Sequence, residues 1–247
     1  MSTAPPPARP AGRLPRRLLQ LYAGLALYGA SSALLIRAGL GLGPWDVFHQ
    51  GLAERTGWTI GAVSVAVGAL VLLLWWPLRQ RPGLGTVSNV FAVGLSMDAT
   101  LAAVPDVHGL AAQAGALAAG VVLNGVATGL YIAAAFGPGP RDGLMTGLHR
   151  RTGRSVRLVR TGIELTVLAA GFLLGGSVGL GTVVYALAIG PLAQFFLRVF
   201  ALRGTAGRDR PSPVRSTPPK ARPSSPPGPA GPGGTPSGTP GASAGVR

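Results

Sequence analysis

The sequence contains no cysteine and little charge of either sign. Without a thiol, disulfide-bonded scaffolds, thiolate metal sites and cysteine nucleophiles are excluded. Charged residues make up only 12% of the 247 residues, whereas a soluble domain carries about 25%. The chain therefore has too few charges to cover a water-facing surface.

Acidic residues are the scarcest class, with 7 Asp and Glu against 22 Lys and Arg. The basic excess is concentrated at the two ends. Residues 1–17 carry four Arg and residues 204–247 a net charge of +5, which leaves +6 for the long middle of the chain. Charge at the ends of a hydrophobic chain gives no reason to predict a nucleic-acid partner, and we expect none.

The ends differ from the middle in composition as well. Residues 1–17 and 204–247 are rich in Pro, Gly, Ser, Thr and Arg. They cannot bury enough apolar surface to offset the entropy of ordering, about 1–2 kcal/mol per residue for the backbone. We predict two disordered tails around a membrane domain.

Six apolar stretches between these tails have the length of a membrane-spanning helix, for which about 20 residues are needed. They are Leu18–Ile36, Trp58–Leu78, Thr86–Val104, Ala111–Phe136, Ser155–Leu174 and Thr182–Phe200. The sequence therefore predicts an all-α, polytopic membrane protein with the bilayer as its solvent.

The membrane domain contains an internal repeat. A shift of 96 residues aligns 21–102 with 117–198 without a gap and gives 29 identities in 82 pairs. Apolar bias would match Leu and Ala, but it would not match Pro, Asp, Arg and Thr at one shared offset. We predict two homologous units, residues 18–107 and 108–203.

Each unit contains three stretches, an odd number, so the second copy is expected to enter the membrane from the opposite side, as in transporters with inverted repeats. Arg and Lys collect in cytoplasmic loops. Arg79 and Arg81 of the first copy align with Gly175 and Ser177 of the second. This exchange of charge predicts an inverted 3+3 repeat with both termini in the cytoplasm.

A Gly-Pro-x-Asp segment follows the first stretch of each copy, at Gly43–Asp46 and Gly139–Asp142. Pro44 and Pro140 suit the first helical position, and the Asp residues suit the first turn. Gly57 and Gly153 suit the stop. We predict two short helices, Pro44–Arg55 and Pro140–Arg151, followed by spans that Thr59 and Ser155 cap.

Two interpretations of these short helices stay open. In one, they lie at the membrane interface and Asp46 and Asp142 only stabilise the helix starts. In the other, they dip into the membrane from opposite faces and point at a central cavity. Irregular backbone at that depth needs cover from protein or water, and such paired elements mark binding sites in transporters.

Polar residues in the membrane domain give further candidates. Asp98, Arg160 and Glu164 lie within predicted spans, where charges usually face a bundle interior or one another. Arg160 and Glu164 can pair across one helical turn. Asn124 is expected to hydrogen-bond between helices, and His49 lies on the polar side of the first short helix.

The sequence shows no enzyme signature. The three histidines are not spaced as metal ligands, and no Ser-His-Asp arrangement or phosphate-binding glycine motif is present. We therefore expect no metal, no cofactor and no enzymatic activity, with an unrecognised intramembrane active site as the remaining exception.

Three motifs together resemble the YczE/YyaS/YitT family of bacterial integral membrane proteins, and within it the YczE-like group. The resemblance covers about residues 18–200 and is carried by Gly41-Leu42-Gly43-Pro44-Trp45-Asp46-Val47, Arg79-Gln80-Arg81-Pro82-Gly83-Leu84-Gly85-Thr86 and Gly139-Pro140-Arg141-Asp142-Gly143-Leu144-Met145. It implies a multi-pass protein of the bacterial cytoplasmic membrane. It implies no substrate and no site residues.

The leading hypothesis from the sequence is a secondary transporter for a small solute. The alternative is an accessory or scaffold membrane protein that serves a partner complex, and a protein partner or homo-oligomer is compatible with both. The candidate solute-binding residues are Gly43, Pro44, Asp46, His49, Asp98, Gly139, Pro140, Asp142, Arg160 and Glu164.

Overall fold

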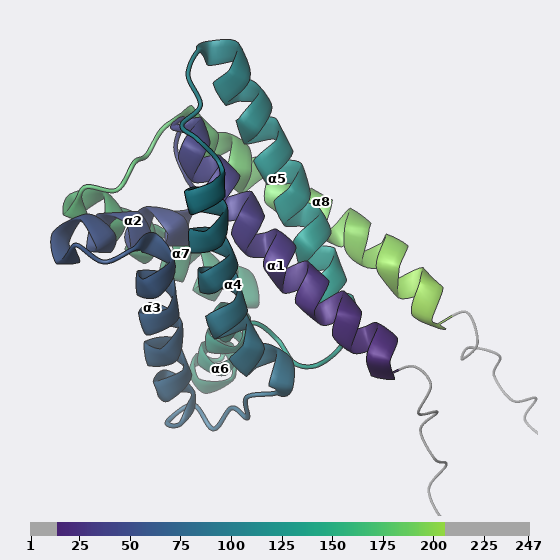
Figure 1. The fold of residues 1–247 in the computed structure, drawn as a ribbon. Coiled ribbons are helices and arrows are strands. Elements are labelled where there is room, and N and C mark those ends of the chain that lie inside the picture. The colour runs from purple at the N-terminus through teal and green to yellow at the C-terminus, as the bar shows by residue number, and fades with distance from the viewer. Residues whose placement is uncertain (1–13, 206–247) are drawn as a thin grey trace, which may run out of the picture. The chain divides into compact units, whose positions relative to one another are not determined.

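The computed structural model describes residues 14–205, and side chains up to residue 200. This part of the chain forms eight helices and no strand. They are α1 (Leu14–Ala38), α2 (Pro44–Thr56), α3 (Ile60–Trp75), α4 (Leu84–Ala103), α5 (Leu110–Ala133), α6 (Pro140–Thr152), α7 (Val156–Leu174) and α8 (Leu180–Thr205) (Figure 1). The all-helical class predicted from the sequence is confirmed.

The helices form two matching sets of four. Helices α1 to α4 begin at residues 14, 44, 60 and 84, and α5 to α8 begin at 110, 140, 156 and 180. Every start in the second set lies 96 residues after its counterpart, which is the offset of the sequence repeat. The duplicated sequence therefore folds into the same succession of elements twice.

The short helices α2 and α6 have the predicted starts and stops. Gly43 and Gly139 are the N-cap residues, each followed by Pro at the first helical position. Gly57 and Gly153 end the helices in the left-handed region, with φ of 74° and 68°. A residue with a β-carbon avoids that region, which explains the glycine at both stops.

The predicted caps of the following helices are also confirmed. The Thr59 hydroxyl accepts a hydrogen bond from the Ala62 N–H, and the Ser155 hydroxyl accepts one from the Leu158 N–H. Each cap satisfies one of the free N–H groups at a helix start. The chain therefore turns sharply after each short helix, and α2 and α3 meet at an angle of 112°.

Four of the described helices are long and apolar enough to cross a membrane, namely α1, α4, α5 and α8, and the bent pair α2–α3 can supply a fifth crossing. The sequence predicted six. Helix α3 has only 16 residues because the chain turns after Trp75, so at 1.5 Å per residue it is about 24 Å long, less than the hydrocarbon core. Helix α7 is long enough, with 19 residues, but it is not among the candidate crossings because it carries three charged residues, Arg157, Arg160 and Glu164.

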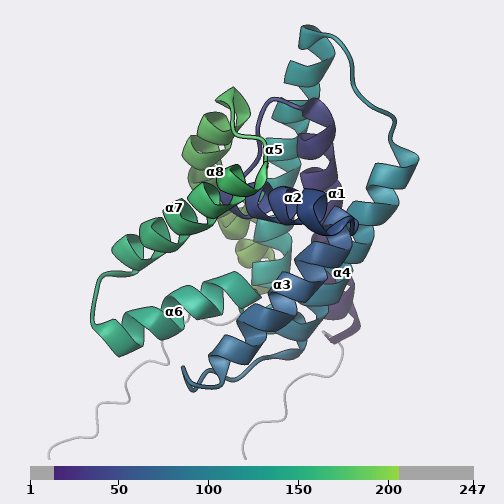
Figure 2. The ribbon, with the colours of Figure 1, turned by 90° about the vertical axis from the view of Figure 1, so that its left-hand side faces the viewer.

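The long helices α1, α4, α5 and α8 pack in equivalent pairs, with α1 against α4 and α5 against α8, while α1 and α5 lie side by side (Figure 1 and Figure 2). Small residues allow the close approach. A β-carbon on Gly120 would lie 2.8 Å from Leu35 of α1, and one on Gly129 would lie 2.7 Å from Phe196 of α8. Asn124 of α5 links α1 and α8, since it donates to Ser31 Oγ of α1 at 2.9 Å and accepts from Tyr185 Oη of α8 at 3.2 Å.

The repeated Gly-Leu-Gly-Thr motifs join the two halves of the fold. Gly85 at the start of α4 donates its N–H to the Phe136 carbonyl at 2.9 Å, and Gly181 at the start of α8 donates to the Leu40 carbonyl at 2.7 Å. Phe136 and Leu40 precede the short helices of the opposite halves. The two contacts are equivalent: in each, the last helix of one half binds the segment that precedes the short helix of the other half. Each short helix is thus held by the other half.

Helix α1 begins at Leu14, before the apolar stretch that marked its start in the sequence. Arg17 binds the carboxyl end of α5, donating to the carbonyls of Ala134 and Ala135 at 3.1 Å, and its guanidinium lies over the Phe136 ring. The remainder of both predicted tails lies outside the described residues.

Candidate functional site

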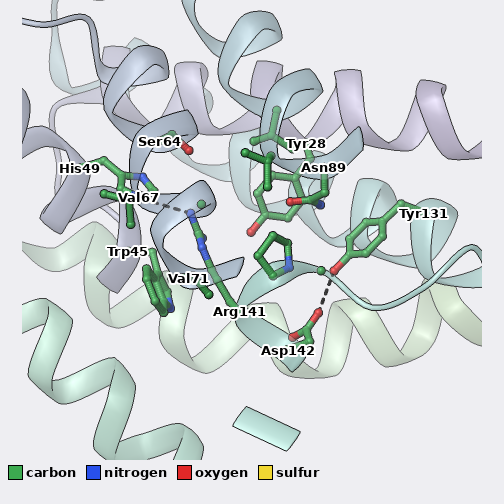
Figure 3. A pocket seen from close by; sticks show the side chains of 15 residues that line it. Tyr28, Trp45, His49, Ser64, Val67, Val71, Asn89, Tyr131, Arg141 and Asp142 are labelled. Carbon is green, nitrogen blue, oxygen red and sulfur yellow. Dashed lines mark hydrogen bonds between the residues drawn. The ribbon is translucent and has the colours of Figure 1, made fainter. Parts of the chain in front are cut away.

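The first turns of α2 and α6 meet inside the fold. Trp45 and Arg141 occupy the x position of the two Gly-Pro-x-Asp segments. The Arg141 Cζ lies 4.8 Å from the centre of the Trp45 ring, a cation–π contact between equivalent positions. Side chains from the two starts therefore contact one another (Figure 3).

A small polar pocket lies where these helix starts meet. Its volume is about 80 Å³. Polar side chains from six helices reach it: Tyr28 of α1, His49 of α2, Ser64 of α3, Asn89 of α4, Tyr131 of α5, and Arg141 and Asp142 of α6 (Figure 3). Apolar residues of α3 and α4, including Val67 and Val90, close it. Both halves thus contribute to one pocket.

The start of α6 is fixed in this pocket by buried aromatic residues. The Tyr131 hydroxyl donates to Asp142 Oδ2 at 3.1 Å. The Trp75 Nε1–H donates to the Pro140 carbonyl at 3.0 Å, and the Trp75 ring leaves no room for a side chain at Gly143. The orientation of Arg141 and Asp142 is therefore imposed by α3 and α5.

Arg141 and Asp142 are adjacent in the chain but point in different directions, Arg141 toward His49 and Asp142 toward Tyr131 (Figure 3). The distance from Arg141 Nη2 to His49 Nε2 is 3.5 Å. Among the described residues, no carboxylate lies within 4.0 Å of the Arg141 guanidinium. The pocket thus presents a cation and an anion that do not neutralise one another.

The first turn of α2 contributes a buried acid–base pair next to the pocket. Asp46 is 4% exposed and His49 is fully buried. Asp46 Oδ1 and His49 Nδ1 are 3.6 Å apart, and neither atom has a hydrogen-bond partner within the described part of the chain. A helix lying on an interface would turn such groups toward water, whereas here they face the protein interior.

The structure brings together some of the residues predicted from the sequence. His49, Gly139, Pro140 and Asp142 line the pocket, and the Asp46 carboxylate lies next to His49. Gly43 and Pro44 begin α2 beside it, and Gly43 packs against the Tyr185 ring, where a β-carbon would approach Cε1 to 2.8 Å.

Asp98 is not part of this cluster. Its carboxylate accepts hydrogen bonds from the Thr59 hydroxyl at 2.6 Å and from the Gly61 N–H at 2.8 Å. It therefore caps the start of α3 from α4.

Arg160 and Glu164 also lie away from the pocket. They form the predicted pair on α7, with Arg160 Nε 2.8 Å from Glu164 Oε1. Their side chains are 51% and 31% exposed.

The pocket residues that the sequence did not point to include Tyr28, Trp45, Tyr131 and Arg141. A signal for Arg141 was present, because it is the variable residue between the Pro and the Asp of a repeated motif. The tyrosines had no local signal, because they lie within apolar helices and their contacts come from distant segments.

The pocket offers groups that suit the binding of a polar solute. In the described residues, no group of three His, Asp or Glu side chains is placed to hold an ion. The available chemistry is a guanidinium, a carboxylate, an imidazole and two phenol hydroxyls around a small space. Such groups recognise a polar solute by charge and hydrogen bonds.

Comparison with known proteins places the chain in a family. The model of the family of unknown function DUF6198 matches residues 15–198. The chain belongs to this family. The match spans both halves of the repeat and both Gly-Pro-x-Asp segments.

Three relatives cover most of this DUF6198 member. An uncharacterised protein of Haemophilus influenzae is 40% identical over 73% of the chain and 83% of its own length. The uncharacterised membrane protein YczE of Bacillus subtilis is 34% identical over 80% and 94%. The uncharacterised protein YyaS of the same organism is 26% identical over 71% and 90%.

These matches confirm the resemblance to the YczE and YyaS proteins. Together with the four long apolar helices, they identify a membrane protein of a family whose function is unknown. No solved structure matches the chain.

Proposed function

We propose that this protein is a secondary transporter that moves a small solute across the bacterial cytoplasmic membrane. The observation that carries the proposal is that α2 and α6, the equivalent short helices of the two halves, both contribute residues to one polar pocket. Paired helix starts of this kind hold substrate at the repeat interface in known transporter folds.

The burial of ionisable groups supports the same proposal. An ionisable group in the membrane interior costs several kcal/mol unless it is paired or solvated, so such groups mark substrate and ion pathways. Asp46 and His49 are almost completely buried and only loosely paired. A carrier can use such an arrangement to hold a solute or a coupling proton.

We further propose that the two halves have opposite orientations and that the chain crosses six times, with α3 and α7 completing the set. The matching order of helices supports this arrangement, as does the exchange of arginines between equivalent loops. Rocking of the halves around the shared pocket would then expose it to each side in turn. Both termini would lie in the cytoplasm.

The proposal is tested by solute uptake. Metabolite profiling of a deletion strain would identify solutes whose level depends on the protein, and counterflow into reconstituted vesicles would measure their transport. Asp46→Asn and Asp142→Asn are expected to lower uptake about tenfold or more, because a lost charge-assisted hydrogen bond costs about 1.5–3 kcal/mol.

The matched control is Asp106→Asn, whose carboxylate is 69% exposed and which is expected to keep wild-type uptake. The amount of each variant in the membrane is measured in parallel. Full uptake by both the Asp46 and the Asp142 variants would remove the pocket from the mechanism. The absence of flux for every profiled solute would favour the scaffold alternative.

A further inference from the structure

An apolar groove leads away from the polar pocket. It lies between α2, α3, α6 and α7 and has a volume of about 660 Å³, within the range of small-molecule sites. Its walls include Phe48, Leu52, Leu144, Leu148, Val67 and Ile163. Apart from Thr152, Arg154 and Thr166, every lining residue is apolar or glycine.

Both halves build this groove from equivalent residues. Phe48 and Leu144 are repeat partners, as are Leu52 and Leu148, and Val67 and Ile163. The groove therefore lies along the same junction as the polar pocket.

The groove and the pocket adjoin one another. Trp45, Val67 and Val71 line both of them. From Leu144 the groove follows α6 to Thr152, a distance of about 12 Å at 1.5 Å per residue. One molecule can therefore have its polar end in the pocket and an apolar chain in the groove.

The pocket defines the chemistry of the polar end. Arg141 has no carboxylate partner within 4.0 Å among the described residues, and a guanidinium binds carboxylate or phosphate groups with its fork of N–H donors. Asp142 uses Oδ2 to accept from Tyr131 and can accept from a cation with its other oxygen. Two charges of opposite sign at adjacent positions match a ligand that carries both.

We propose that the solute of this transporter is an amphiphile with a small zwitterionic head, bound by Arg141 and Asp142, and an apolar chain that lies in the groove. This inference rests on the proposed function and names its substrate class. The volume of about 80 Å³ for the pocket selects a compact head, such as an α-amino acid group.

The test uses photolabelling of the full chain in nanodiscs of phosphatidylcholine. The probe is α-aminododecanoic acid with a diazirine in its alkyl chain, and labelled residues are mapped by mass spectrometry. Labelling of α3, α6 and α7 within the groove is expected, with saturation. Unlabelled α-aminododecanoic acid should compete at least tenfold better than dodecanoic acid, dodecylamine or dodecanol, each of which lacks one or both charges.

Two sets of variants test the binding of the polar head and of the apolar chain separately. Arg141→Gln is expected to reduce labelling at least tenfold, and Arg141→Lys and Arg154→Gln, at the outer end of the groove, less. The control that should leave labelling unchanged is Arg157→Gln on α7, which lines neither the pocket nor the groove. Gly162→Phe should abolish labelling by filling the groove, and Gly115→Phe should not, since a β-carbon meets open space at both glycines and only Gly162 lines the groove.

Equal competition by dodecanol, or labelling that survives both Arg141→Gln and Gly162→Phe, would overturn the inference and indicate ordinary lipid contact. Dependence on Arg154 in place of Arg141 would place the head at the wrong end and would also overturn it. If labelling fails but a hydrophilic solute is taken up and its uptake depends on Asp142, the amphiphile inference is wrong and the transporter proposal stands. Specific labelling without flux of the amphiphile would instead contradict transport.

Discussion

Gly143 and Trp75 form the tightest contact near the pocket. An added β-carbon on Gly143 would lie 1.9 Å from the Trp75 ring, which itself is 2% exposed. The ring also holds the Pro140 carbonyl through Nε1. The absence of a side chain at Gly143 thus allows α3 to support the start of α6.

Gly143→Ala is expected to lower the free energy of unfolding by about 1–3 kcal/mol, the usual cost of overpacking a core. The control is Gly162→Ala on α7, where open space surrounds the new methyl group and the gain in helix propensity is about 1 kcal/mol. Denaturant unfolding of both purified variants, followed by tryptophan fluorescence, measures the difference. Equal stability of the two variants would show that Trp75 moves away freely.

At the scale of helices, Asp98 has a structural task. It caps the start of α3 by accepting from the Thr59 hydroxyl and the Gly61 N–H. An acceptor at a helix start contributes about 1 kcal/mol, within a range of 0.5–2 kcal/mol. This position gives an alternative to the solute-binding role expected for Asp98 from the sequence.

Asp98→Ala is therefore expected to destabilise the fold by about 1–2 kcal/mol and to leave the pH dependence of uptake unchanged. Thr59→Ala removes a donor to the same carboxylate and the hydroxyl cap of α3, and should have an effect of the same kind and of similar size. The measurements are thermal unfolding and uptake at several pH values. A shifted pH profile in Asp98→Ala, with Thr59→Ala unchanged, would assign Asp98 to ion coupling instead.

The short helices could be predicted because their signals are local. Proline at the first position, glycine at the stop and a hydroxyl cap on the next helix all lie within a few residues of the boundary they set. The crossings were harder to count, because apolar composition continues beyond the end of the helix at Trp75.

The pocket was only half predictable for a related reason. The aspartates were visible because they break the apolar pattern twice at one offset. Tyr28 and Tyr131 became candidates only when the structure placed α1 and α5 beside the helix starts.

At the scale of the whole molecule, the relative orientation of the halves is the property that the transport proposal needs most. Trp58 and Arg154 are repeat equivalents that follow α2 and α6, and both are exposed. Their backbone N–H groups make the same 3.4 Å contact, to Thr56 and Thr152 respectively. They are therefore matched reporters of the two halves.

Because the chain has no cysteine, Trp58→Cys and Arg154→Cys each create a single thiol. In intact cells, a membrane-impermeant maleimide is expected to label the thiol at position 58 and not the one at 154, since arginine-rich loops stay in the cytoplasm. After permeabilisation both should react. Labelling of both thiols in intact cells would mean parallel halves and would remove the basis for alternating access.

The contact between Trp45 and Arg141 joins equivalent positions of the two repeat copies. In a symmetric homodimer the equivalent residues of the two subunits are identical, so this place would hold two tryptophans or two mutually repelling arginines. Once both copies belong to one polypeptide, the two positions can diverge, and a ring can face a cation. The contact between unlike residues thus needs both copies in one polypeptide, and expressing either half as a self-associating protein would not reproduce it.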